Sequence, residues 1–149
     1  MLLRSGSIKL LEATPDKIRW DYLSSNPSAI HLLEANPNKT YLYWASKNPA
    51  AIHLLKENIG CIDWMLLSGN VNAIQLLEAN RKNIYWSQLS LNPAAIHLLE
   101  SNFESIDWNR LSANPEAIHL LAQYPENINW NQLSTNPAIF KVYHAHLIP

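Results

Sequence analysis

Apolar and polar positions along this chain repeat with a period of 22 residues. An asparagine opens each copy, and in five of six copies the dipeptide Ala-Ile and a pair of leucines follow it. The asparagines are Asn26, Asn48, Asn70, Asn92, Asn114 and Asn136. A second column carries Trp20, Trp64, Trp86, Trp108 and Trp130, with Leu42 in its second place. A fixed period of this length is typical of proteins built from stacked structural repeats.

The first half of each copy predicts a short helix. Proline follows every repeat asparagine except Asn70. Because proline disfavours the α conformation in the residue before it and suits the first helical position, Asn-Pro predicts a helix start with asparagine as N-cap. From Pro27 the stretch PSAIHLLEA places its alanine, isoleucine and leucines on one face. The next pair, Asn36-Pro37, predicts the end of that helix.

The second half of each copy predicts another short helix. Segments such as SIDWNRLS carry Ile, Trp and Leu at offsets that one helical face can hold. Asp63, Asp107 and Asn129 precede the tryptophan position and are predicted to cap this helix, which we expect to be 3₁₀ in part. Helices this short do not persist alone in water, so each copy needs its neighbours.

The predicted fold class is therefore all-α, an α-solenoid of helix–turn–short-helix repeats with terminal caps. We expect one solenoid domain over residues 1–149, with about six repeats anchored at the six asparagines. The leading unit keeps Ile8, Leu10, Leu11 and Glu12 in register, and the last unit replaces alanine by Ile139 and the leucine pair by Val142 and Tyr143. Bulkier residues there are expected to close the end of the core.

A leucine-rich-repeat horseshoe is the alternative fold. Its repeats have a similar length, and Ile-x-Trp-x-x-Leu-x-x-Asn loosely matches their signature. The Leu-x-x-Leu-x-Leu spacing is absent, however, and a proline directly follows the asparagine in question.

The sequence of the repeat resembles that of a known group of proteins. The unit LSxNPxAIxLLExNPxxIxW, over about residues 4–144, is similar to the short repeat proteins of giant DNA viruses of the marseillevirus and mimivirus type. It resembles more distantly the leucine-rich variant repeats, which alternate an α-helix with a 3₁₀ helix, although their Val-Arg pair is missing. The resemblance implies architecture and a viral origin, and it implies no catalytic residue.

Composition narrows the function classes. The 149 residues carry eleven Lys and Arg against twelve Asp and Glu, so no basic excess exists to neutralise a phosphate backbone. Cys61 is the single cysteine, which excludes an internal disulfide and fits a reducing compartment. The start MLLRSGSIKLLEATP lacks the continuous apolar segment of a signal peptide, and no run of 18 apolar residues predicts a membrane span. We expect an intracellular or virion protein that is not secreted.

Three columns of residues are candidates for chemistry. His31, His53, His97 and His119 share one position that the helical wheel places in solvent, where His31–Glu34 and His97–Glu100 pairs are expected. Neighbouring histidines in such a stack are too far apart to share one zinc ion. The serines two residues before each repeat asparagine are expected to make structural hydrogen bonds, since catalysis needs one activated nucleophile. The tryptophans are expected in the core.

The informative feature is a break in the repeat pattern. The position after the tryptophan column reads Asp21, Tyr43, Met65, Ser87, Asn109 and Asn131, and the next position reads Tyr22, Trp44, Leu66, Gln88, Arg110 and Gln132. The later copies are polar at both positions, whereas the earlier ones, apart from Asp21, are apolar or aromatic. Stacking would gather Tyr22, Tyr43, Trp44, Met65 and Leu66 in one exposed patch, which is typical of a partner surface. In the alternative, the irregular stretch TYLYWASKNPA repacks them into the core.

These observations predict a non-enzymatic repeat protein that mediates protein–protein interaction. Through the resemblance it is expected to be an adaptor, a virion component or a host-directed factor of a giant virus. Self-association through the N-terminal half, most simply as a two-fold homodimer, is the simplest form. The alternative is a helical-repeat nucleic-acid-binding protein, which would need a basic face that no repeat position supplies. No catalytic residue, cofactor, metal or small-molecule substrate is predicted.

Overall fold

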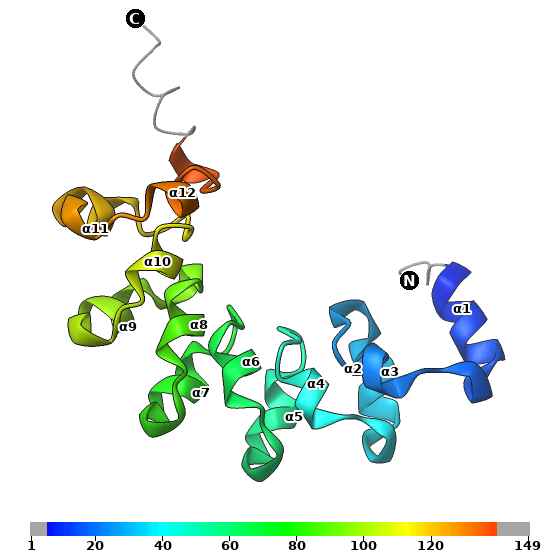
Figure 1. The fold of residues 1–149 in the computed structure, drawn as a ribbon. Coiled ribbons are helices and arrows are strands. Elements are labelled where there is room, and N and C mark those ends of the chain that lie inside the picture. The colour runs from blue at the N-terminus through cyan, green and yellow to red at the C-terminus, as the bar shows by residue number, and fades with distance from the viewer. Residues whose placement is uncertain (1–5, 140–149) are drawn as a thin grey trace, which may run out of the picture. The chain divides into compact units, whose positions relative to one another are not determined.

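The computed structural model describes residues 6–139 of the chain, and every regular element in this part is a helix (Figure 1). The chain divides into two compact units, residues 1–63 and 64–149. The part described contains no strand, so the leucine-rich-repeat horseshoe does not hold there. One domain spanning both units stays a prediction.

Both units consist of α-helices of four to eight residues and three-residue 3₁₀ helices, labelled η. The elements of the first unit are α1 (Gly6–Ala13), η1 (Pro15–Lys17), α2 (Trp20–Ser24), η2 (Pro27–Ala29), α3 (Ile30–Ala35), η3 (Pro37–Lys39), α4 (Leu42–Ala45), α5 (Ile52–Lys56) and η4 (Ile59–Cys61). Those of the second unit are α6 (Trp64–Ser68), α7 (Ile74–Glu78), η5 (Arg81–Asn83), α8 (Trp86–Ser90), η6 (Pro93–Ala95), α9 (Ile96–Glu100), η7 (Phe103–Ser105), α10 (Trp108–Leu111), α11 (Ile118–Gln123), η8 (Pro125–Asn127) and α12 (Trp130–Leu133).

The first α-helix of a repeat begins later than the Asn-Pro pair predicts. In the copy that begins at Asn26, the Asn26 side chain accepts a hydrogen bond from the Ser28 N–H at 3.0 Å, and this bond closes the 3₁₀ turn η2. The α-helix starts only at Ile30. A side chain that caps the amide two residues on favours a tight turn first. The predicted helix start, with Asn26 as cap and Pro27 at the first helical position, is therefore confirmed, but as a 3₁₀ turn that precedes the α-helix.

The predicted end of this helix is confirmed. Helix α3 stops at Ala35, and the Asn36 amide nitrogen donates to the Leu32 carbonyl at 2.9 Å, so a side chain satisfies one of the last helical carbonyls. The same bond recurs from Asn58, Asn80 and Asn102. The 3₁₀ character predicted for the second helix lies just before it, in η3 and its equivalents, whereas the tryptophan helices themselves are α. Asp107 and Asn129 cap two of them, as expected.

The core follows the alanine and the leucine pair. Ala29, Leu32 and Leu33 are buried, and Ile30 is half-buried against them. The tryptophans lie farther out than predicted. Those of α2, α6, α8 and α10 are half-buried, and Trp130 in α12 is 67% exposed. The innermost side chains are those of the leucines and alanines, together with the repeat serines and asparagines.

At the ends of the chain, the structure describes part of the predicted caps. Leu10 is exposed and Leu11 half-buried, whereas the leucines equivalent to Leu10 are buried in four later units and half-buried in the one with Leu54. Ile139 is half-buried. Val142, Tyr143 and the side chains of Ile8 and Glu12 lie outside the part described.

Hydrogen bonds from the repeat asparagine join consecutive repeats. Asn114 is fully buried; its Oδ1 accepts from the Glu116 N–H at 3.0 Å, and its Nδ2 donates to the carbonyls of Ser90 at 2.9 Å and Asn92 at 3.2 Å. Asn48, Asn92 and Asn136 make the same three bonds, of which the two from Nδ2 go to the repeat before. Of these three bonds, the repeat pattern predicted only the cap, which the Oδ1 atom makes.

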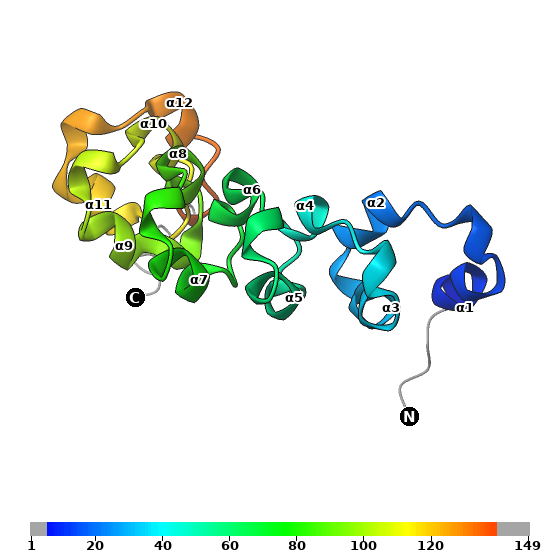
Figure 2. The same ribbon diagram turned by 90° about the horizontal axis from the view of Figure 1, so that it is seen from below.

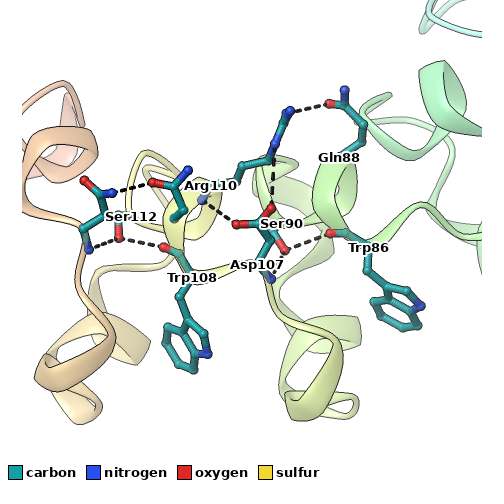
Figure 3. Close-up of polar contacts among 9 residues, drawn as sticks. Trp86, Gln88, Ser90, Asp107, Trp108, Arg110 and Ser112 are labelled. Atoms are coloured by element: carbon teal, nitrogen blue, oxygen red, sulfur yellow. Dashed lines mark hydrogen bonds and ion pairs between the residues drawn. The ribbon is translucent and has the colours of Figure 1, made fainter.

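A serine makes the second link between repeats. The Ser90 hydroxyl donates to the Trp86 carbonyl at 2.8 Å and accepts from the Asp107 N–H of the next repeat at 3.0 Å (Figure 3). Ser24 and Ser112 repeat this pair of bonds. The predicted structural role of the serine column is therefore confirmed. We call these recurring asparagine and serine bonds the Asn–Ser ladder.

The ladder brings the tryptophan helices together. In the second unit α6, α8 and α10 pack side by side, with α7 and α9 attached to them (Figures 1 and 2). In the first unit α2 packs against α4 in the same way. Residues one and two positions after the tryptophan therefore lie next to their equivalents in the adjacent repeat.

The ladder predicts a graded loss of stability. Asn114→Ala removes a cap, worth about 1 kcal/mol, and takes the Nδ2 bond away from the buried Ser90 carbonyl, which costs about 1–3 kcal/mol. The Asn92 carbonyl keeps its bond from the Ala95 N–H, so we expect a total loss of about 2–4 kcal/mol. Asn26 is exposed and makes the same cap, so Asn26→Ala is the matched control, with an expected loss of about 1 kcal/mol. Urea unfolding followed by circular dichroism measures both. Equal losses for the two variants would contradict the role of the ladder.

Candidate protein-interaction surface

The five residues predicted to form a patch lie at the surface, with one exception. Tyr22 is 65% exposed, Tyr43 49%, Trp44 36% and Met65 41%, whereas Leu66 is half-buried. The alternative, in which the irregular stretch repacks these side chains into the core, therefore does not hold for the first four. Tyr22, Tyr43 and Trp44 belong to the first unit, whereas Met65 and Leu66 lie in α6 of the second. A single patch across both units stays a prediction.

The three aromatic residues of the first unit contact one another. The rings of Tyr22 and Trp44 stack at an angle of 18° with centroids 6.5 Å apart, and Tyr43 meets Trp44 edge to face at 5.2 Å. Tyr22 comes from α2 and the other two from α4, so the packing of two successive tryptophan helices brings them together. Both arrangements are ones that aromatic pairs prefer. We call these three residues the α2/α4 face.

Cations lie over aromatic rings of this unit, and the repeat pattern did not identify them. The Arg19 guanidinium lies 4.8 Å from the Tyr22 ring centroid, and the Lys47 ammonium lies 5.2 Å from that of Trp44. Lys39 lies 5.1 Å from the ring centroid of the neighbouring Trp20. Each contact is a cation–π interaction. Lys39 and Lys47 stand directly before and after the stretch TYLYWAS, which was the available signal.

A carboxylate neutralises one of the three cations. Arg19 donates two hydrogen bonds to Asp21, at 2.7 and 3.1 Å. The hydrogen bond from Arg19 lowers the pKa of the Asp21 carboxyl, and the same bond raises the pKa of Arg19. Lys39 and Lys47 form no ion pair within residues 6–139. The α2/α4 face therefore combines exposed rings with the positive charge of Lys47, whereas Lys39 lies over the ring of Trp20.

An open depression lies beside Trp20 in the same unit. It has a volume of about 310 Å³, and its lining residues are Trp20, Asn38, Lys39, Thr40 and Tyr41. The equivalent residues of the second unit form another of about 320 Å³, lined by Trp64, Lys82, Asn83, Ile84 and Tyr85. Neither lining contains a histidine, a cysteine or a carboxylate. Chemically, these depressions can accept an apolar or planar side chain beside a lysine.

The equivalent positions of the second unit are polar and contact one another. Arg110 donates to the Gln88 side chain at 3.3 Å, and its backbone N–H donates to Asp107 (Figure 3). Asn129 donates to the Asn109 side chain, one repeat earlier. Stacked repeats thus accept polar side chains where the first unit carries aromatic ones.

The histidine column pairs differently from the prediction. His119 lies 2.9 Å from Glu100 of the preceding repeat, and the equivalent pairs are His53–Glu34 at 2.9 Å and His97–Glu78 at 3.2 Å. The predicted pairs within one helix, His31–Glu34 and His97–Glu100, are wrong, because equivalent helices of adjacent repeats lie close enough for the contact to form between them. His31 is half-buried, contrary to prediction, and its Nε2 atom is buried with no hydrogen-bond partner among the side chains that the structure describes.

Residues 6–139 contain no group of three or more His, Cys, Asp or Glu side chains that could hold a metal ion. Within the same residues, no helix has the length and apolar character of a membrane span. Comparison of the chain with protein-family models, with curated proteins and with solved structures gave no match. Function is therefore inferred from the residues of this chain.

The histidine column is expected to be a surface feature without metal affinity. His97→Gln reproduces the glutamine that the chain itself carries at residue 75, and His97 is exposed, so we expect a change in unfolding free energy below about 1 kcal/mol. We also expect excess Zn²⁺ to leave the Tm of the wild type unchanged in differential scanning fluorimetry. A zinc-dependent rise of Tm that His97→Gln abolishes would show that the column binds metal.

Proposed function

We propose that this chain is a non-enzymatic helical-repeat protein that binds protein through its N-terminal half, and that it self-associates there in the simplest case. The observation that carries the proposal is the α2/α4 face, where Tyr22, Tyr43 and Trp44 are exposed and packed together. Tyrosine and tryptophan are the residues most enriched at the energetic centres of protein interfaces.

The fold does not require aromatic residues at these positions. Gln88 and Arg110 occupy the position of Tyr22 and Trp44 in later repeats, and Asn109 occupies that of Tyr43. Gln88 lies in α8, and Asn109 and Arg110 lie in α10. These helices are equivalent to α2 and α4, and the same Asn–Ser ladder holds them. Exposed aromatic side chains that the fold does not need are best accounted for by a partner that covers them.

The proposal extends to architecture and origin. We propose that the repeats continue as one α-solenoid through both units, since the Asn–Ser ladder recurs in each of them. The sequence of the repeat supports an origin among the giant-virus repeat proteins. We propose a role as adaptor, virion component or host-directed factor. Nucleic-acid binding is less well supported, because Lys39 and Lys47 alone offer few phosphate contacts.

The test replaces the aromatic residues by those of later repeats. Tyr22→Gln, Tyr43→Asn and Trp44→Arg reproduce Gln88, Asn109 and Arg110, so the fold should tolerate them. Light scattering coupled to size exclusion measures the mass over a range of concentrations. We expect the wild type to exceed the 17.0 kDa of one chain, and the triple variant to remain at that mass.

Tyr85→Asn is the matched control. Tyr85 is an exposed tyrosine of the second unit, and the equivalent position carries Asn129 two repeats later. This variant should associate as the wild type does, and circular dichroism should show equal helicity for all three proteins. A wild type that stays monomeric at all concentrations, or a triple variant that associates like the wild type, would overturn self-association through this face.

A further inference from the structure

One repeat of the first unit carries smaller side chains at two positions of the pattern. Leu42 stands where five other copies carry a tryptophan, and Thr40 stands where the same copies carry an isoleucine. Beside these two residues lies a pocket of about 240 Å³, which Leu54, Glu57 and Asn58 also line. All of them belong to the first unit. We call this space the Leu42 pocket.

In a later repeat a tryptophan ring occupies the corresponding space. Trp108 stands at the repeat position of Leu42, and its ring centroid lies 5.3 Å from that of Phe103 and 5.6 Å from that of Tyr124. The residues of the Leu42 pocket at the positions of those two rings are Pro37 and Asn58. An indole at this repeat position therefore lies between residues equivalent to two walls of the pocket.

The leucine that lines the pocket is less covered than its equivalents. Leu54 is half-buried, whereas the leucines at its position in four other repeats are at most 9% exposed. These are Leu32, Leu76, Leu98 and Leu120. In the first of these repeats, Trp20 packs against the buried cluster that contains Leu32. Leu42 is shorter than an indole and leaves part of Leu54 in contact with water, so a group that entered the pocket would bury apolar surface.

The Leu42 pocket fits an indole in size and chemistry. A cavity of about 150 Å³ holds benzene, so about 240 Å³ accommodates the larger bicyclic ring. Leu42 and Leu54 offer apolar walls. Glu57 is exposed, forms no ion pair within residues 6–139, and stands where other copies carry alanine, serine or glutamine. Its carboxylate can accept a hydrogen bond from the indole N–H, which is a donor only.

We infer that the Leu42 pocket binds a tryptophan side chain of a protein partner, whose indole takes the place that a tryptophan of the chain itself takes in other repeats. This inference rests on the proposed function, since that proposal makes the source of the indole a protein, and it names the group that the partner inserts. Leu42 belongs to α4, the helix that also carries Tyr43 and Trp44. Tryptophan side chains that fill pockets are among the strongest contributors to the stability of protein interfaces.

Binding of N-acetyltryptophanamide to the full-length, isotope-labelled chain tests this inference. We expect the probe to shift the amide NMR signals of Thr40, Leu42 and Leu54, with a Kd on the order of 1 mM. Leu42→Trp places the chain's own indole in the pocket and should abolish these shifts. The same substitution should raise the Tm, because it fills a cavity with the residue that the repeat carries elsewhere.

A second variant and two controls accompany this test. Thr40→Ile narrows the pocket by restoring the isoleucine of the other repeats, so it should weaken binding even where Leu42→Trp perturbs the fold. Gln75→His is the matched control, since it restores the histidine of other repeats at an exposed position of α7 in the second unit, and it should bind the probe as the wild type does. N-acetylleucinamide, which has no ring, should leave the signals unshifted at the same concentration.

The outcomes separate the Leu42 pocket from the α2/α4 face. Wild-type signals that do not shift, or shifts that persist unchanged in Leu42→Trp and Thr40→Ile, would overturn the inference. Shifts produced by free indole and not by the amide probe would also overturn it, because a tryptophan held in a polypeptide could not then enter. Probe binding that Leu42→Trp abolishes, in a wild type that light scattering shows to be monomeric, would support the pocket and overturn self-association. A wild type that associates through the α2/α4 face and takes up no probe would do the reverse.

Discussion

The structure depends on the buried amide of the repeat asparagine. In Asn114 this side chain uses its oxygen to close a turn in its own repeat and its nitrogen to bind two carbonyls of the repeat before it. A buried amide is costly unless its donors and acceptor are satisfied, and here the two bonds of the amide nitrogen form only when two repeats are in register. The requirement therefore fixes the stacking more strictly than apolar contact between leucines and alanines does, since hydrophobic burial has no direction.

The same interaction frees the outer surface to vary. The leucine pair and the Asn–Ser ladder hold the repeats together, so the fold does not require particular residues after each tryptophan. The chain places aromatic rings there in the first unit and polar residues in the second. The basic residues around Tyr22 and Trp44 are differences of the same kind. Function in this chain is thus expected to lie in departures from the repeat.

The sequence predicted most features that depend on a residue's own neighbourhood along the chain. Local spacing and polarity predicted the end of a helix just before Asn36 and the structural role of Ser90. They also predicted that Tyr22 and Tyr43 are exposed. Features that depend on the contact between repeats were missed. The second role of the repeat asparagine and the pairing of His119 with Glu100 require knowing which groups 19–24 residues apart come close in space. The half-buried tryptophans were missed for a related reason, because helical periodicity assigns a face and does not measure how deep that face lies.

One property of the ladder concerns how such a chain could change length during evolution. The amide nitrogen of Asn92 binds main-chain carbonyls of the preceding repeat, and the Asp107 main-chain N–H binds the Ser90 hydroxyl. Main-chain groups are present whatever the side chain. Any copy that keeps the asparagine and the serine can therefore follow any other copy, and duplication or deletion of a 22-residue block leaves the junction chemistry intact. Gene segments of this kind can be multiplied first and diversified on their outer positions afterwards.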